Sequence, residues 1–162
     1  MRLPVIAFVA WTACAQPLQV PFIQQEKNGC GAASVAMVMG YWGGPRVAGT
    51  KVYNDLIDAR RKGILLDDMK RYLIEHGYHA FTLRGQWPDL EDHLAKGRPI
   101  IIGLRPKKSK GIHFAVLVGS EDGSVWLNDP TRTKAHRMKQ PDFRKQWELA
   151  ENWMLLATPA GS

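Results

Sequence analysis

One stretch indicates both the fold and the chemistry of this chain: Gln24-Gln25-Glu26-Lys27-Asn28-Gly29-Cys30-Gly31-Ala32-Ala33-Ser34. It sets a cysteine between two glycines, at the start of a small, apolar run that continues to about Tyr41. A run that is apolar nearly all round predicts a central buried helix rather than an amphipathic surface helix. At the start of a helix, unpaired backbone amides and the positive end of the helix dipole favour the thiolate form of a cysteine over the thiol. The alternative interpretation of Cys30 is a small, inert, buried cysteine.

Two later segments supply a histidine and an acid. Gly111-Ile112-His113-Phe114-Ala115-Val116-Leu117-Val118-Gly119 starts an apolar strand at His113, and Asp129 follows the next strand in Leu127-Asn128-Asp129-Pro130. With Gln24 before Cys30, the chain offers a thiol, an imidazole, a carboxylate and an amide, which are the four parts of a cysteine-nucleophile site. Taken singly, each has a plainer explanation: a core or edge histidine, an aspartate bonding its own turn, a surface glutamine.

The length of 162 residues predicts one domain with a substantial core. The first residues of the chain have the pattern of an export signal. Met1-Arg2 is followed by an apolar run, Leu3 to Ala13, that is too short to span a bilayer comfortably. Ala13-Cys14-Ala15 then satisfies a small-x-small cleavage rule. We therefore expect a signal peptide over residues 1–15 and a single domain over residues 16–162.

Two alternatives remain for this N-terminal segment. Thr12-Ala13-Cys14 resembles the end of a bacterial lipoprotein signal, in which Cys14 would be lipidated and would attach the protein to a membrane. The second alternative is that the segment forms a structural N-terminal strand or helix. Either export route predicts a periplasmic or extracellular protein, and both remove Cys14 from any disulfide. An exported protein that keeps a lone thiol, Cys30, suggests chemistry at that thiol.

The formal net charge is +7, and the basic residues gather in two places. One is the run Arg105-Pro106-Lys107-Lys108-Ser109-Lys110, and the other comprises Arg132, Lys134, Arg137 and Lys139. Such surfaces suit an anionic membrane face, an acidic peptide or a nucleic acid, but a solvated, lysine-rich loop is the favoured interpretation. No aromatic residues interleave with the basic run, so no nucleic-acid partner is expected.

Periodicity and helix breakers predict helices in the first half of the chain and mainly strands in the second. The expected helices span 30–41, 50–62, 65–76, 87–96 and 141–149, and the expected strands span 78–83, 99–104, 113–118, 124–127, 134–139 and 153–157. This order indicates an α+β domain in which a helical half packs against an antiparallel sheet. An active site between the halves would take Cys30 from one and His113 from the other.

Several motifs in this chain resemble those of a known family. They are Cys30-Gly31-Ala32-Ala33 with Gln24 six residues before the cysteine, Tyr41-Trp42-Gly43, His113-Phe114-Ala115-Val116-Leu117-Val118-Gly119, and Asn128-Asp129-Pro130. The family is that of the papain-like cysteine peptidases, specifically the bacteriocin-processing peptidases that cut after a double-glycine leader (family thirty-nine of the cysteine peptidases) and their stand-alone relatives. The resemblance covers about Val20 to Ala157.

The chain also departs from that family. Many transporter-linked members carry aspartate directly before the cysteine, where this chain has Gly29. No ATP-binding or membrane-spanning part follows, and the export signal differs from the cytoplasm-facing peptidase domains. The resemblance therefore implies a stand-alone, secreted bacterial member, with its chemistry intact and its substrate not defined as a double-glycine leader.

The resemblance implies a papain-like fold and a thiol peptidase that acts on a peptide or protein substrate. His113 would deprotonate Cys30, which attacks a peptide carbonyl, and Asp129 would orient the imidazole and stabilise its charge. Gln24 and the backbone amide of Cys30 would hold the oxyanion. Gln25 would take the role of Gln24 if the register slips by one residue.

Two other classes of function share these residues. A thiol acyltransferase or transpeptidase would pass the acyl group to an amine instead of water, and a non-catalytic peptide-binding module would keep the fold without turnover. The sequence has no C-x-x-C, no H-E-x-x-H and no phosphate-binding loop, so no metal and no cofactor are expected. The acidic pairs Asp67-Asp68 and Glu91-Asp92 lie on expected helices and are interpreted as solvated faces.

Overall fold

The computed structural model describes residues 16–44, 49–57, 64–107 and 109–161. The expected signal peptide over residues 1–15, including Cys14, lies outside the described residues, as does the end of the helix expected over 50–62. None of the helices within the described ranges is long and apolar enough to cross a membrane.

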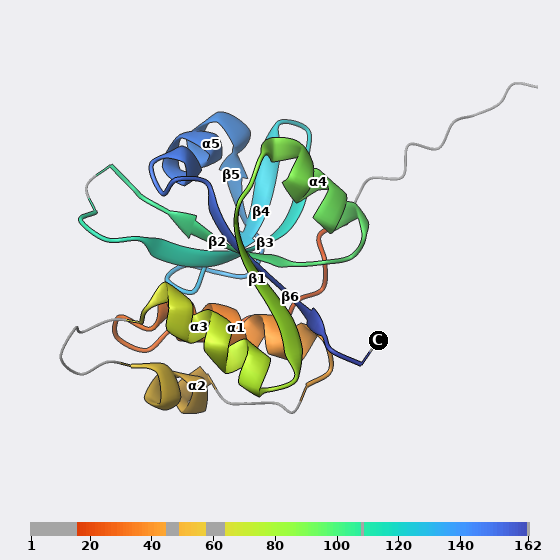
Figure 1. The fold of residues 1–162 in the computed structure, drawn as a ribbon. Coiled ribbons are helices and arrows are strands. Elements are labelled where there is room, and N and C mark those ends of the chain that lie inside the picture. Colours follow the sequence, from red (N-terminus) through yellow and green to blue (C-terminus); the bar gives the residue numbers. More distant parts are fainter. Residues whose placement is uncertain (1–15, 45–48, 58–63, 108, 162) are drawn as a thin grey trace, which may run out of the picture.

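A six-stranded sheet, in which every neighbouring pair is antiparallel, forms the centre of the described molecule (Figure 1). The strand order is β1-β6-β2-β3-β4-β5, so the last strand of the chain lies between the first two. The strands are β1 (Tyr78–Arg84), β2 (Ile100–Leu104), β3 (His113–Glu121), β4 (Ser124–Asn128), β5 (His136–Lys139) and β6 (Trp153–Pro159).

Helices cover both faces of this sheet (Figure 1). Three of them pack on one face and form the larger hydrophobic core with it, whereas the other two pack on the opposite face over a second core. The predicted α+β class is confirmed, although the sequence suggested helices on a single side. The helices are α1 (Cys30–Tyr41), α2 (Gly49–Leu56) and α3 (Leu66–Glu75) on the first face, and α4 (Trp87–Ala95) and α5 (Gln140–Glu148) on the second.

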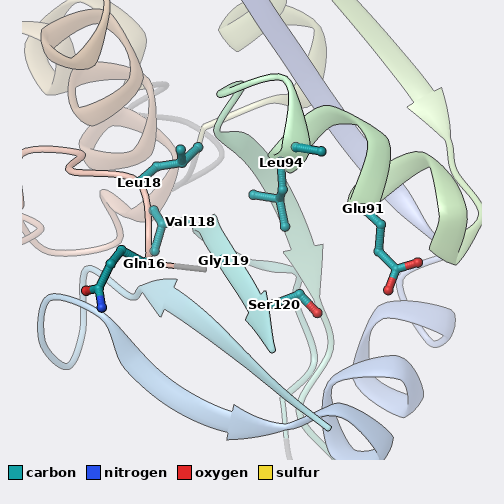
Figure 2. Close-up of a pocket in the computed structure, with 8 residues that line it drawn as sticks. Gln16, Leu18, Glu91, Leu94, Val118, Gly119 and Ser120 are labelled. Atoms are coloured by element: carbon teal, nitrogen blue, oxygen red, sulfur yellow. The ribbon is translucent and has the colours of Figure 1, made fainter. Parts of the chain in front are cut away.

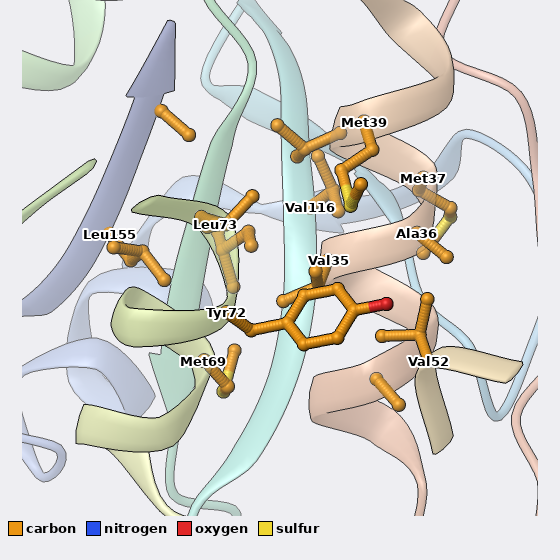
Figure 3. Close-up of a cluster of buried hydrophobic side chains, with 14 of the residues drawn as sticks. Val35, Ala36, Met37, Met39, Val52, Met69, Tyr72, Leu73, Val116 and Leu155 are labelled. Carbon is orange, nitrogen blue, oxygen red and sulfur yellow. The ribbon is translucent and has the colours of Figure 1, made fainter. Parts of the chain in front are cut away.

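Helix α1 is the centre of the larger core, which Figure 3 shows in close-up. Residues 31–39 are all buried, so the helix presents apolar or small side chains to neighbours on every side, as predicted. Met37 and Met39 belong to this core together with Leu73 of α3 and Val116 of β3. Burying side chains of this size stabilises the fold by roughly 1.5–3 kcal/mol each, so packing holds the start of α1 against the sheet.

The second core lies beneath α4 and α5. Ile100 and Ile102 of β2 pack there with Leu90 and Phe143, whereas Ile101 points to the opposite face and joins the core around α1. Alternate residues of β2 are therefore buried on opposite sides of the sheet, because side chains alternate along a strand. This burial explains why β2 is an uninterrupted apolar run.

The expected elements agree closely with the observed ones, with two exceptions. Helix α2 ends at Leu56, short of the expected residue 62, and residues 58–63 are not described. Strand β3 continues past the expected end at Val118 to Glu121, beyond a register shift between Leu117 and Gly119. Such a bulge changes which face the later side chains occupy, and alternation of apolar residues does not reveal it.

An N-terminal segment, residues 16–29, runs alongside the sheet before α1 begins, and Asn128 anchors it. The Asn128 side chain donates from Nδ2 to the Val20 carbonyl at 3.1 Å and accepts from the Ala135 amide at Oδ1 at 2.8 Å. Leu18 adds a backbone bond to the Val118 carbonyl at 2.7 Å. Buried Asn128 therefore ties this segment and the β4–β5 connection to the end of β4.

We predict that Asn128→Ala lowers the free energy of unfolding by about 1–3 kcal/mol, because it leaves buried backbone groups without partners. Thermal or urea unfolding of the purified variant measures this loss. Asn54→Ala is the matched control, because Asn54 is exposed on α2 and its loss should change stability by less than about 0.5 kcal/mol. Equal effects of the two substitutions would show that Asn128 does not anchor the segment.

Candidate active site

Cys30 is the first residue of α1 and follows a tight backbone turn. Asn28 has a positive φ of 60°, and the Gly29 amide donates to the Glu26 carbonyl at 2.8 Å. Gly29 is the N-cap residue, and no side chain caps the helix start. The free amides and the positive end of the helix dipole therefore lie beside the partly exposed thiol.

The two glycines that flank Cys30 are explained by packing. A Cβ atom at Gly29 would lie 2.8 Å from the ring of Tyr53 on α2, and one at Gly31 would lie 2.9 Å from the sulfur of Met69 on α3. Such distances are too short for ordinary contacts, so a larger residue would force the side chain of Tyr53 or Met69 to move. The two glycines therefore let α2 and α3 pack close to the nucleophile.

His113 begins β3 and faces the thiol from the sheet. Its Nε2 atom lies 2.8 Å from Oδ1 of Asp129, and its imidazole interacts with the Cys30 side chain and lowers the pKa of the thiol. Because Asp129 occupies Nε2, Nδ1 remains for the thiol. The structure therefore brings together Cys30, His113 and Asp129, three of the four residues that the sequence singled out.

Asp129 is held by more partners than the sequence indicated. Its Oδ1 atom accepts hydrogen bonds from the backbone amide of Thr131 at 2.9 Å and from the Thr131 hydroxyl at 2.7 Å, in addition to His113. Arg132 Nε lies 3.5 Å from Oδ2. The Asp129 side chain is only 5% exposed, so these contacts compensate for burying its charge. The pattern Asp-Pro-Thr, with a hydroxyl two residues after the acid, is the sequence signal for this turn.

These contacts change the pKa values of Cys30, His113 and Asp129 so that the charged form of each is favoured. Burial opposes the thiolate, but the hydrogen bond and charge of His113, with backbone bonds from Phe114 and Gly31, hold the pKa of Cys30 below its ordinary value. Burial also opposes the imidazolium, yet Asp129 and Cys30 raise the pKa of His113 to about 9. His113 and Thr131 overcome burial at Asp129 and lower the pKa of its carboxyl to about 2. At neutral pH the array can hold a thiolate–imidazolium pair beside a carboxylate.

The two glutamines before the cysteine differ in their surroundings. The side chain of Gln24 is exposed, whereas Gln25 is half-buried and its Oε1 atom is buried without a hydrogen-bond partner. The Gln25 backbone amide donates to the Pro130 carbonyl at 3.2 Å and ties this segment to the β4–β5 connection. Both amides lie on the segment that leads into Cys30, and the choice between Gln24 and Gln25 stays open.

A pocket of about 270 Å³ lies elsewhere, at the opposite end of β3 from His113 (Figure 2). It is lined by Leu18, Leu94, Val118 and neighbouring residues, with Glu91 at its edge. No residue of the Cys30–His113–Asp129 array lines it. The pocket therefore does not contribute to the candidate site.

The remaining acids and histidines form no second site. Among the described residues, no group of three or more histidine, cysteine, aspartate or glutamate side chains could hold a metal ion. Asp68 pairs with Arg71 and Asp92 with Lys96 on exposed helix faces, and His76 stacks on Tyr72. These residues account for the surface of α3 and α4, which agrees with the expectation of solvated acidic faces.

A cysteine at the start of a buried helix, facing a strand histidine backed by an acid, is the arrangement of a papain-like thiol peptidase. Residues 17–154 match the model of the Peptidase_C39 like family, and the chain belongs to this family. The family and the fold suggest a peptidase. No curated protein matches the chain.

Solved structures of this family are similar over most of the chain. A double glycine motif protease from an AMS/PCAT transporter, solved with its leader peptide, is 25% identical with a TM-score of 0.70, over 90% of this chain and 96% of that one. A C39-like peptidase from Bacillus anthracis is 19% identical with a TM-score of 0.68, over 86% and 94%. The peptidase domain of Streptococcus ComA is 18% identical with a TM-score of 0.70, over 85% and 97%. The latter two show the fold alone.

We predict that alkylation of Cys30 by iodoacetamide reaches its half-maximal rate at a pH below that of an ordinary thiol such as glutathione. His113→Ala should move this midpoint above the ordinary value, because burial of Cys30 then acts without its compensating partner. Asp129→Asn should move it upwards by less, because the imidazole remains but loses the charge that raises its pKa. Peptide-resolved mass spectrometry reports Cys30 separately from Cys14. Identical midpoints in the wild type and His113→Ala would contradict the coupling.

Proposed function

We propose that this protein is a cysteine peptidase that hydrolyses a peptide bond through Cys30. The observation that carries the proposal is the array of Cys30, His113 and Asp129 across the junction of α1 and the sheet, in which His113 is bonded to Asp129 and interacts with the thiol. Each partner shifts the ionisation of its neighbour in the direction that catalysis needs. Family membership supports the same chemistry.

The array would act in two half-reactions. The Cys30 thiolate attacks the carbonyl carbon, and the His113 imidazolium donates its proton to the departing amine as the C–N bond breaks. The resulting thioester is then attacked by water, whose proton passes to neutral His113, and the carboxylic acid product leaves as the thiolate returns. Asp129 keeps the imidazole oriented and stabilises its positive charge in both steps.

The oxyanion that forms at each attack needs donors near Cys30. The backbone amide of Cys30 lies at the uncapped start of α1, where amides have no partners within the helix. A side-chain amide from Gln24 or Gln25 would supply the second donor. Gln24 has the spacing from Cys30 that the family resemblance implies, and exposed Gln24 is free to turn towards a bound substrate.

The proposed substrate is a peptide or protein segment in an extended conformation. One similar structure is a protease in complex with a leader peptide, which is consistent with peptide binding on this fold. Transfer of the acyl group to an amine would use the same residues and is the second candidate. The proposal includes export to the periplasm or the outside of the cell, with lipid attachment at Cys14 as the alternative processing route.

We predict that the wild type cleaves members of a proteome-derived peptide library and that Cys30→Ala abolishes these cuts. His113→Ala should lower kcat/KM by at least about 10³-fold, because both the base and the acid are lost. Mass spectrometry in H₂¹⁸O separates the two candidate reactions, because hydrolysis places ¹⁸O in the new carboxyl terminus. Cuts that persist in Cys30→Ala would reject the proposal, and products joined to an added amine would favour acyl transfer.

We also predict that one glutamine substitution lowers kcat by about 10²-fold to 10³-fold with little change in KM, because an oxyanion donor acts mainly in the transition state. Gln24→Ala and Gln25→Ala are natural controls for each other, since the two residues are adjacent and chemically identical. The proposal favours Gln24. If Gln25→Ala alone slows the reaction, the register slips by one residue, and if neither does, no side-chain amide stabilises the oxyanion.

A further inference from the structure

Two basic connections flank the candidate active site at one end of the sheet. Leu104 of β2 pairs with His113, so the β2–β3 connection, of which residues 105–107 and 109–112 are described, leaves and rejoins the end of the sheet that carries the histidine. Leu127 of β4 pairs with His136, so the β4–β5 connection, residues 129–135, leaves the same end. Figure 1 shows both connections on the side where α1 begins.

These connections carry a large excess of positive charge. Together they carry six basic residues and a single acid, Asp129, which is already bonded to His113. Lys107, Lys110 and Lys134 are exposed, and none of them pairs with a carboxylate within the described residues. Lysines elsewhere, such as Lys51 and Lys96, do have carboxylate partners.

The two connections lie on opposite sides of the thiol–imidazole pair. The β4–β5 connection contacts the segment before Cys30, because Pro130 accepts the Gln25 amide. The β2–β3 connection ends at Ile112. Ile112 and Trp153 both lie against Gly103, and Trp153 packs against Phe114 with 5.4 Å between ring centroids. Strand β3, which carries His113, lies between β2 and β4, so an extended chain laid across the ends of these strands would pass both connections.

The helical wall of the site does not cancel this charge. Its acids Glu26, Asp67 and Asp68 lie in the same segments as the bases Lys27, Lys70 and Arg71. Glu26 accepts a hydrogen bond from Thr50, and Asp68 pairs with Arg71. The two connections therefore give the sheet side of the site an excess of positive charge that the helical side does not cancel, which attracts a negatively charged substrate.

We infer that these connections select polypeptide substrates with acidic residues on both sides of the cleaved bond. This inference rests on the proposed peptidase function and narrows its substrate class. The connections flank His113 at the end of the sheet, where their cations would contact a bound substrate rather than anchor the protein. A docked membrane at this end would cover the site. Unpaired lysines near a cleft act mainly on association rate and specificity, and their effect weakens as salt rises.

Alkylation of Cys30 by a charged and a neutral reagent tests the field without a known substrate. The ratio of the rates with iodoacetate and iodoacetamide should fall as salt rises from about 10 mM to about 500 mM, because the Debye length shortens from about 30 Å to a few ångströms. Lys110→Gln with Lys134→Gln should lower the low-salt ratio by about twofold to threefold. Lys96→Gln with Lys139→Gln removes the same net charge from distant surfaces and should leave the ratio unchanged. Equal ratios in the two double variants would overturn the inference.

Peptide cleavage gives the second measurement. Matched peptides with glutamate or glutamine flanking a cut found in the library should differ in kcat/KM by about threefold to tenfold at low salt in the wild type. The difference should shrink in Lys110→Gln with Lys134→Gln. Equal cleavage of both peptides would overturn the inference and leave the peptidase proposal standing, whereas an ordinary titration of Cys30 would reject the peptidase proposal itself.

Sedimentation with vesicles distinguishes a membrane surface from a substrate. The probe is phosphatidylcholine vesicles containing about one third phosphatidylglycerol. We expect the same weak binding by the wild type and by Lys110→Gln with Lys134→Gln. If this double substitution releases the protein from vesicles and leaves peptide discrimination intact, the connections are a membrane-docking surface and the substrate inference is wrong.

Discussion

The buried carboxylate of Asp129 is the constraint on which the candidate site depends. A nearly unexposed anion is costly unless hydrogen bonds replace its water, and Thr131 and His113 provide three such bonds to one oxygen. The charge thus retained keeps the His113 imidazole protonated, and the imidazolium in turn stabilises the Cys30 thiolate. Each charged group stabilises its neighbour, so a small change in the turn after β4 would change the pKa of the Cys30 thiol, which is distant in the sequence.

This chain of interactions requires three distant segments to meet, and the fold achieves that through packing. The register between β3 and β4 brings His113 and the end of β4 to the same end of the sheet, and the core around α1 holds the nucleophile against them. Asn128 links this end of the sheet to the N-terminal segment. Because α1 is buried on all sides, its position has little freedom, which preserves the geometry of the thiol and imidazole.

Much of this arrangement could be predicted from the sequence, because local signals are strong where burial is complete. The apolar run after Cys30 and the β-branched run of β2 predicted their elements closely. The position of β6 between β1 and β2 could not be predicted, because pairing between distant strands leaves no local pattern. Thr131 was missed for a similar reason: a threonine in a polar turn looks the same whether its hydroxyl faces water or Asp129. The choice between Gln24 and Gln25 depends on side-chain orientation, which neither spacing nor composition determines.

Gly29 connects the packing of the helices to the electrostatics of the site. The ring of Tyr53 lies 2.8 Å from the place of a Cβ atom at this position, so a side chain before Cys30 would require Tyr53 to move. Asp129 is the acid that acts on the pair, and it is bonded to His113 on the far side of the imidazole from the sulfur. The close contact between Gly29 and Tyr53 therefore favours a residue without a charged side chain before the nucleophile, and the charge that holds the imidazolium comes from the sheet through Asp129.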